Sequence, residues 1–278
     1  MVGRRALGLL PPRAQGRART LSQRVRRARF KPRLVEHAYA GHRMRVEIHS
    51  GYGLVYDQDW PELAEIALLK QHRLAPGARV FNLGANHGVI ALMLAQAVGP
   101  EGHVVALEAN PYDARAAARN AELNDVRQLT CLSAAVGEES GEIGFALGGE
   151  VDDGSGRGGS VRVPAYSLDD LAARHGPPDV VFMDVEGYEF RALAGAETTL
   201  EQRPNWFVEV HGEEAIGRYG GSVAGVVDTF TSRGYDCMLA ADGLGKLTDG
   251  RLVSQTRFRP LGEASDLLAG GRFFLIAL

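Results

Sequence analysis

Short apolar runs alternate with amphipathic segments along most of the chain. The apolar runs hold four to eight residues and lie at 79–83, 103–107, 128–133, 179–183 and 206–210. Helical patterns follow them near 88–98, 111–123, 167–174, 187–202 and 222–233, and two closing strands are expected at 235–241 and 272–278. Buried strands that alternate with helices form a mostly parallel sheet with both faces covered. The pattern therefore predicts one doubly wound α/β domain.

Further segments define the limits of this domain. Residues 43–51 have the pattern of a strand and 60–72 that of an amphipathic helix, so residues 34–75 are expected to form an extension ahead of the main domain at 76–278. The segment 148–160 is rich in glycine and too poor in apolar residues to pack, and we expect a mobile loop there. The pattern indicates no internal repeat and no second core.

Charge is distributed unevenly along the chain. Residues 1–33 carry eleven of the 31 Lys and Arg residues and no acid, which leaves 20 basic and 34 acidic residues elsewhere. Such an arm can be a disordered tail, a transit peptide, or a contact to nucleic acid or anionic membrane. We expect a disordered arm, because its like charges repel one another. The acidic body argues against nucleic acid as the main ligand.

Two features bear on the cellular compartment. No stretch approaches the roughly 20 apolar residues that a membrane-spanning helix needs. The two cysteines, Cys131 and Cys237, lie in apolar strand-like runs, which predicts reduced core thiols rather than a disulfide. Both features favour a cytoplasmic protein.

The sequence RVFNLGANHGVIALMLAQA (79–97) places a glycine turn between a strand and a helix. Gly84 can adopt a sharp turn without a Cβ penalty, and Gly88 would let the helix pack tightly against the strand. The free amides at the helix N-terminus suit an anionic group. Asn86 stands where a dinucleotide fingerprint has its second glycine, so its side chain would crowd a pyrophosphate. S-Adenosylmethionine fits better, because it has no pyrophosphate and carries a carboxylate.

An acidic residue follows at the spacing that nucleoside binding requires. Glu108 ends the next apolar run, 24 residues after Gly84. In dinucleotide-binding folds an acid about 20 residues after the turn accepts hydrogen bonds from the ribose hydroxyls. The candidate cofactor-binding residues all lie in the turn or at the neighbouring strand ends: Asn82, Gly84, Ala85, Asn86, Gly88, Glu108, Ala109, Asn110 and Ala135.

Acids and a histidine end two later apolar runs. Asp184 and Glu186 follow the run at 179–183, whereas Glu209 and His211 end the run at 206–210. Since the carboxyl ends of neighbouring parallel strands meet at one edge of a sheet, the four side chains should lie close together there. Structural ion pairs would explain any single one of these residues, but four at strand ends indicate a catalytic centre.

The chain resembles the FkbM-type methyltransferase family, a branch of the class I S-adenosylmethionine-dependent methyltransferases. The resemblance covers residues 79–212 and lies in VFNLGANHGVIALMLA, GHVVALEANP, RNAELN, SLDDL, FMDVEGYEFRALAGA and RPNWFVEVHG. It implies a seven-stranded Rossmann-like sheet, S-adenosylmethionine as cofactor, and O-methylation of a hydroxyl on a sugar or natural-product-like small molecule. The chain departs from the family at Asn82, where an Asp usually helps to hold the ammonium of the cofactor.

The candidate catalytic residues are Asp184, Glu186, Glu209 and His211. Methyl transfer to a hydroxyl needs a base, and His211 titrates near neutrality when it is unperturbed, so His211 or Asp184 is expected to take the proton. Carboxylates can hold Mg²⁺, but the spacing does not demand a metal and none is expected. Two alternatives remain open: a non-catalytic cofactor-binding relic, motivated by Asn82, and a nucleotide-dependent oxidoreductase.

Overall fold

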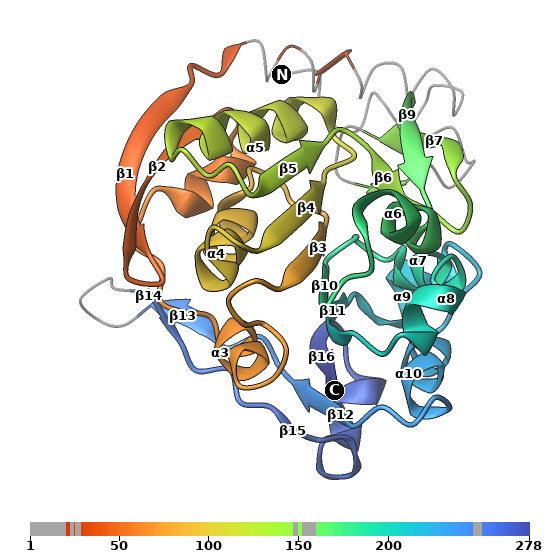
Figure 1. Cartoon of the computed structure of the whole chain (residues 1–278). Helices are drawn as coiled ribbons and strands as arrows, with labels where there is room; N and C mark the ends of the chain where they lie inside the picture. Colours follow the sequence, from red (N-terminus) through yellow and green to blue (C-terminus); the bar gives the residue numbers. More distant parts are fainter. Residues whose placement is uncertain (1–20, 23–24, 26–28, 147–149, 152–159, 247–251) are drawn as a thin grey trace, which may run out of the picture.

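An eight-stranded sheet forms the centre of the molecule (Figure 1). The computed structural model describes residues 21–22, 25, 29–146, 150–151, 160–246 and 252–278. The sheet has the order β15-β12-β16-β11-β10-β3-β4-β5. Its strands are β3 (Arg79–Leu83), β4 (His103–Leu107), β5 (Leu129–Leu132), β10 (Val180–Met183), β11 (Asn205–Val210), β12 (Cys237–Ala240), β15 (Arg259–Pro260) and β16 (Phe273–Ala277).

The strand directions confirm the doubly wound, mostly parallel sheet. The pairs from β11 through β10, β3 and β4 to β5 are parallel, whereas β16 runs antiparallel to β11 and to β12. Seven strands of four to six residues match the expected count, and the two-residue β15 adds a short edge. Cys131 and Cys237 are free thiols.

Alternation along the strands divides the core between two faces of the sheet. Val80 and Phe182 pack on one face with the N-terminal part of the chain, whereas Phe81 and Val181 pack on the other. Because neighbouring residues of a strand point to opposite faces, a strand covered on both sides must be apolar throughout. This requirement explains the continuous apolar runs in the sequence.

Helices cover both faces of the sheet, as Figure 1 shows. They are α3 (Ala64–Lys70), α4 (Val89–Val98), α5 (Pro111–Leu123), α6 (Leu168–His175), α7 (Glu189–Ala194), α8 (Glu197–Glu201), α9 (Gly212–Gly217) and α10 (Val223–Thr231). Three of them begin at a side-chain cap, because Asn110, Ser167 and Ser222 each accept a hydrogen bond from an amide in the first turn. The prediction of a single helix at 187–202 is wrong, because α7 ends before Gly195 and α8 follows it. A Cβ on Gly195 would lie 2.5 Å from the Glu138 carbonyl oxygen.

The N-terminal extension is an antiparallel hairpin followed by the short 3₁₀ helix η1 (Tyr52–Tyr56) and α3. The hairpin pairs β1 (Arg33–Tyr39), which the pattern did not predict, with β2 (His42–Ile48). Most of the basic arm at 1–33 lies outside the described residues, but Phe30 packs against the core and Arg33 forms an ion pair of 2.8 Å with Asp57.

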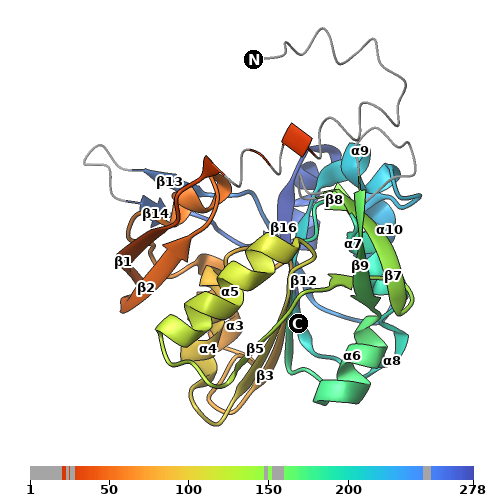
Figure 2. The ribbon, with the colours of Figure 1, turned by 90° about the horizontal axis from the view of Figure 1, so that it is seen from above.

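A small second sheet lies across the molecule from this hairpin (Figure 2). Its order is β6-β9-β7-β8, with bounds β6 (Ala135–Val136), β7 (Gly141–Ala146), β8 (Glu150–Val151) and β9 (Ser160–Tyr166). It has a small apolar cluster of its own around Phe145 and Val163. Of the expected loop at 148–160, residues 150–151 and 160 belong to these strands, and the remainder lies outside the described residues. A hairpin of three residues per strand, β13 (Leu244–Lys246) and β14 (Leu252–Ser254), completes the described strands.

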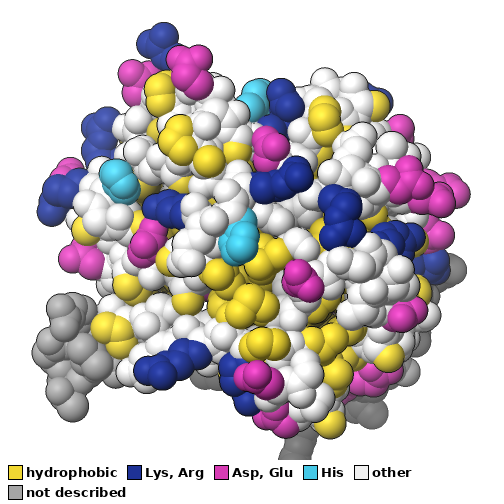
Figure 3. Space-filling model, turned by 60° about the horizontal axis from the view of Figure 1, so that its bottom comes forward, with side chains coloured by type: hydrophobic (Ala, Val, Ile, Leu, Met, Phe, Trp, Pro, Cys, Tyr) yellow, Lys and Arg dark blue, Asp and Glu magenta, His cyan; other side chains and the backbone are white. Residues whose placement is uncertain are grey.

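The surface carries charges of both signs. On the face in Figure 3 the basic and acidic side chains of the described residues are interspersed around a central hydrophobic patch. Among the helices of the described residues, none has the length and hydropathy to cross a membrane.

Candidate active site

A cavity opens at the carboxyl ends of β3, β4 and β10, where a doubly wound sheet is expected to bind ligands. It brings together both groups of predicted residues. Eight of the nine candidate cofactor-binding residues line it, namely Asn82, Gly84, Ala85, Asn86, Glu108, Ala109, Asn110 and Ala135. Asp184 and Glu186 also line the cavity, whereas Glu209 and His211 lie behind them.

The glycine turn is shaped by a neighbouring strand as well as by its own conformation. Gly84 has a φ of 87°, and a Cβ there would lie 1.8 Å from the backbone oxygen of Asp184. The amides of Gly84 and Ala85 both donate to the carbonyl of Leu107 at 2.9 Å. Glycine is therefore required at position 84 because the ends of β3 and β10 almost touch.

Gly88 has a different role from the one predicted. Its φ is 78°, and a Cβ there would lie 2.9 Å from the Cα and Cβ of Ala117 on α5. The close neighbour is thus a second helix rather than the strand, and Gly88 does not line the cavity. The side-chain nitrogen Nδ2 of Asn120, also on α5, donates to the carbonyl of His87 at 2.8 Å and holds the same turn.

Glu108 fixes the turn from the end of β4. Its two carboxylate oxygens accept hydrogen bonds of 2.7 Å from the backbone amides of Asn86 and Asn110. Asn86 has a φ of 49° and accepts from the amide of His87 at 2.8 Å. An ionised carboxylate has about four acceptor positions, so a carboxylate that holds the turn can also accept hydrogen bonds from ribose hydroxyls.

Asn82 places a buried polar atom beside the cavity. Its side-chain nitrogen donates to the carbonyl of Phe182 at 3.5 Å, and the residue is 2% exposed. Its Oδ1 has no hydrogen-bond partner. A buried acceptor without a partner costs about 1–3 kcal/mol, which a ligand with a donor group at this point would recover.

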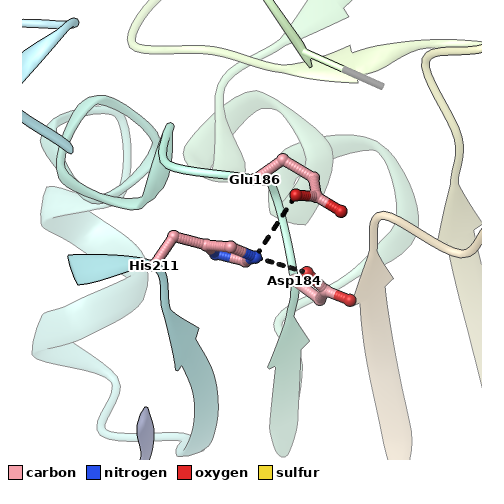
Figure 4. Close-up of side chains that lie close together, drawn as sticks. All are labelled: Asp184, Glu186 and His211. Atoms are coloured by element: carbon pink, nitrogen blue, oxygen red, sulfur yellow. Dashed lines mark ion pairs between the residues drawn. The ribbon is translucent and has the colours of Figure 1, made fainter. Parts of the chain in front are cut away.

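The predicted acids and histidine form one cluster, which we call the acid–histidine cluster: Asp184, Glu186, Glu209 and His211. The parallel pairing of β10 and β11 brings their ends together. The Nε2 atom of His211 lies 3.6 Å from Asp184 Oδ1, 3.5 Å from Glu186 Oε2 and 3.7 Å from Glu209 Oε1. Figure 4 shows the imidazole pointing between the carboxylates of Asp184 and Glu186.

The backbone of the cluster is strained. Glu186 has a φ of 54° and Gly187 a φ of 99°, so the chain turns back sharply after β10. A Cβ on Gly187 would lie 2.9 Å from the Cβ of Ala215. A left-handed conformation at a residue other than glycine costs of order 1 kcal/mol or more and is frequent at functional sites.

Glu189 also belongs to the site, although it was not among the predicted residues. This side chain is fully buried, and its Oε1 accepts from the Nδ1 of His211 at 2.7 Å and from the amide of Gly187 at 3.0 Å. A signal was present, because Glu189 shares a helical face with Ala192 and Leu193, and a charged residue among apolar ones on one face is unusual. Glu189 fixes the orientation of the histidine ring.

The cluster holds an excess of negative charge. Burial raises the pKa of Asp184 well above its ordinary value, and the nearby carboxylate of Glu209 adds to the rise. Burial alone would lower the pKa of His211, but the hydrogen bond to Glu189 and the surrounding acids outweigh it and raise that pKa to about 9. The surroundings of His211 therefore favour its protonated form more than water does for an unperturbed imidazole. Arg272 offsets part of the charge through a 2.8 Å ion pair with Glu209.

Two family models match the chain. The Methyltransferase FkbM domain matches residues 82–237, and the Protein-L-isoaspartate(D-aspartate) O-methyltransferase model matches residues 14–147. No curated protein matches at a significant level.

Solved structures with a distant likeness are methyltransferases. An O-methyltransferase from Thermotoga maritima is 11% identical with a TM-score of 0.44, and the match covers 88% of this chain and 76% of that one. An O-methyltransferase from Bacillus cereus in complex with SAH is 16% identical with a TM-score of 0.43, covering 77% and 78%. The O-methyltransferase TomG from Streptomyces achromogenes in complex with SAM is 16% identical with a TM-score of 0.41, covering 81% and 85%.

Proposed function

Because this chain belongs to the FkbM methyltransferase family, we propose that it transfers a methyl group from S-adenosylmethionine to a hydroxyl of a small molecule. The observation that carries the proposal is one cavity that joins the glycine turn and Glu108 to the carboxylates of Asp184 and Glu186. A cofactor site and a proton-accepting site are thus adjacent at the same sheet edge. The family assignment leaves the oxidoreductase alternative without support.

The residues of the turn fit S-adenosylmethionine. The buried Oδ1 of Asn82 lacks a partner, and the ammonium group of the cofactor is a donor that would satisfy it. Glu108 accepts from the ribose hydroxyls while it holds the turn. Ala109 and Ala135 line the cavity with small apolar side chains, which leaves room for a ring system. When bound, S-adenosylmethionine supplies an electrophilic methyl group, and the products are S-adenosylhomocysteine, the methyl ether and a proton.

The acid–histidine cluster serves the acceptor. Asp184 and Glu186 face the cavity as carboxylates that can accept a hydrogen bond from the acceptor hydroxyl and orient its oxygen. Holding two reacting groups in line can supply roughly 7–11 kcal/mol of the barrier reduction. The cluster also takes up the proton that the hydroxyl loses, which contributes typically about 10²–10⁴-fold in rate. Glu189 acts through His211 as a positioning residue.

The acceptor is a sugar or a natural-product-like scaffold. Tyr52 and Tyr188 both line the cavity. Tyr52 is 68% exposed, and the ring of Tyr188 packs edge-on against Tyr219. Flat aromatic faces beside carboxylates suit a ring that presents hydroxyl groups, because the ring can stack while its hydroxyls donate.

Isothermal titration calorimetry with S-adenosylhomocysteine tests the cofactor assignment. The parent chain should bind one equivalent, and Glu108→Ala should bind about 10-fold to 100-fold more weakly, because each hydrogen bond to a charged group contributes about 1.5–3 kcal/mol. Glu101→Ala, at an exposed acid in the loop between α4 and β4, is the matched control and should bind like the parent. A folded parent chain that binds no S-adenosylhomocysteine would overturn the proposal.

The acceptor itself can be sought by mass spectrometry. Extracts incubated with the chain and S-adenosylmethionine should contain a hydroxylated compound whose mass has risen by that of one methylene group. Asp184→Asn provides the negative control, since it should bind the cofactor but turn over slowly. Cofactor binding without turnover on any extract would support the non-catalytic alternative instead.

A further inference from the structure

At the centre of the acid–histidine cluster, buried polar atoms approach one another without forming hydrogen bonds. The Nε2 of His211 has no hydrogen-bond partner although the side chain is only 9% exposed, and Asp184 Oδ1 also has none. The three carboxylate oxygens around Nε2 lie at 3.5–3.7 Å, which is too far for a hydrogen bond. The described residues thus hold a nitrogen and three oxygens around one point without direct contact.

We propose that Asp184, Glu186 and His211 bind a divalent metal cation. One ligand atom from each residue lies within 4.8 Å of the other two. Around an octahedral cation with bonds of about 2.1 Å, neighbouring ligands lie about 3.0 Å apart and opposite ligands about 4.2 Å apart. The observed distances of 3.5 Å and 3.6 Å from Nε2 fall between these limits. Small side-chain rotations would therefore complete the site.

The second ring nitrogen of His211 supports this assignment independently. A metal-binding histidine almost always donates its other N–H to a carboxylate or carbonyl, which fixes the tautomer. Here Nδ1 donates to the fully buried Glu189 at 2.7 Å. When a cation displaces the proton from Nε2, the Nε2 lone pair faces the carboxylate oxygens of Asp184 and Glu186 (Figure 4). A cation bound there would take the place of that proton and balance the charge of the two carboxylates.

The remaining charges indicate which acids are ligands. Arg272 binds Glu209 at 2.8 Å and Asp242 at 3.1 Å, so the charge of Glu209 is already offset. Asp184 and Glu186 have no Lys or Arg partner among the ion pairs of the described residues. These two carboxylates with one imidazole therefore make the ligand set.

The donor atoms favour Mn²⁺ or Mg²⁺. Carboxylate oxygens suit Mg²⁺, Ca²⁺ and Mn²⁺, whereas an imidazole shifts the preference towards transition metals, so Mn²⁺ satisfies both kinds of donor. Three protein ligands leave coordination positions for water or for an acceptor oxygen. The inference thus deepens the proposed function, on which its catalytic meaning rests, by adding a cation at the acceptor end of the cavity.

Electron paramagnetic resonance tests the site with Mn²⁺ alone. At about pH 8, where competition from protons is weaker, titration of the full chain should show one saturable Mn²⁺ per molecule, displaced by excess Mg²⁺. His211→Ala and Asp184→Asn should weaken binding at least tenfold. Glu186→Gln should do the same, and its 58% exposed side chain makes misfolding an implausible cause. His103→Ala, a partly buried histidine at the opposite end of the sheet, is the matched control and should bind like the parent.

The outcomes separate this inference from the proposed function. The absence of a saturable site in the parent chain, or unchanged Mn²⁺ affinity in folded His211→Ala, would overturn the cation site and leave His211 as a protonated partner of the acids. Calorimetry with S-adenosylhomocysteine on metal-free chain is read separately. Cofactor binding without Mn²⁺ binding refutes only the cation, whereas Mn²⁺ binding without cofactor binding refutes only the proposed function.

Discussion

The two halves of the cavity differ in how their polar atoms are satisfied. In the glycine turn, both oxygens of Glu108 accept backbone amides, and the side chain of Asn86 accepts from His87. In the acid–histidine cluster, the buried atoms Asp184 Oδ1 and His211 Nε2 have no hydrogen-bond partner, and neither has Oε2 of the adjacent Glu189. Both halves occupy the same sheet edge, so their position in the fold does not explain the contrast.

The difference indicates that the two halves are suited to bind a ligand in different ways. The turn is rigid because its own backbone supplies the bonds, and binding there requires little reorganisation. The cluster is held together by burial and by the fit of Glu189 against His211, and its excess charge is left for a proton, a cation or a hydroxyl to balance. Buried polar groups in a low dielectric cost most when they are unpaired, which makes the cluster the more reactive half.

The largest expected effect is a loss of turnover in Asp184→Asn. Its measurement tests whether the two halves of the cavity act separately. Asp184→Asn should lower kcat by about 10²–10⁴-fold, because the acceptor loses its charged partner, while the affinity for S-adenosylhomocysteine changes less than about threefold. Glu108→Ala should do the converse and weaken cofactor binding while kcat at saturating cofactor stays near the parent value. Steady-state kinetics and calorimetry on both variants give the comparison.

The double variant sharpens this result. If the halves are independent, the free-energy costs in kcat/KM should add within about 0.5 kcal/mol. An Asp184→Asn chain that loses cofactor affinity as strongly as Glu108→Ala would show that the two halves form one coupled site. The contact between Gly84 and the Asp184 backbone makes such coupling physically possible.

The sequence was most informative where the chemistry is local. Gly84, Glu108 and Asp184 could be found because each ends an apolar run, and the carboxyl ends of parallel strands meet at one edge. These predictions needed only the order of strands and helices.

Predictions failed where one segment meets a distant one. The neighbour of Gly88 is Ala117 on another helix, and no pattern in the turn encodes that contact. The sheet around Phe145 includes β6 and β8, two strands of only two residues each, which are too short to give a clear period. The raised pKa of His211 depends on a buried carboxylate 22 residues away in the chain. Such effects arise from tertiary packing and cannot be obtained from spacing.

A smaller effect concerns the pH dependence of the free energy of unfolding, through a buried acid near the acid–histidine cluster. Glu65 on α3 is 5% exposed, and burial, together with the acids Glu209 and Asp242, raises its pKa from 4.5 to about 7. A carboxyl with a raised pKa binds protons more tightly in the folded state, so the stability it contributes is fully present below about pH 4.5 and is lost as the pH rises through about 7. At 1.36 kcal/mol per pKa unit, the ionised Glu65 costs the fold about 3 kcal/mol at pH 9.

Urea denaturation at two pH values measures this contribution. Glu65→Gln should unfold with nearly the parent free energy at pH 5 and should be up to about 3 kcal/mol more stable than the parent at pH 9. Glu62→Gln, whose half-exposed carboxylate pairs with Lys70, is the matched control and should change stability by about 0–1 kcal/mol at both pH values. Equal gains at pH 5 and pH 9 would show that Glu65 does not titrate as proposed.

The smallest expected effect concerns Asn82. Its side-chain oxygen lacks a hydrogen-bond partner, although the neighbouring polar atoms of the glycine turn have one. Asn82→Asp would replace the unpaired Oδ1 by a carboxylate facing the cofactor ammonium, and a charged partner is worth more than a neutral acceptor. The gain is limited because a carboxylate at a residue 2% exposed must be desolvated. We therefore expect S-adenosylmethionine to bind between equally tightly and about tenfold more tightly, a change of at most about 1.4 kcal/mol. The chain without cofactor should melt at a lower temperature than the parent, because the new charge has no partner there.

Asn82→Leu removes the acceptor and should bind more weakly than the parent. Calorimetry and thermal melts that show weaker binding in Asn82→Asp would mean that the ammonium lies elsewhere in the cavity.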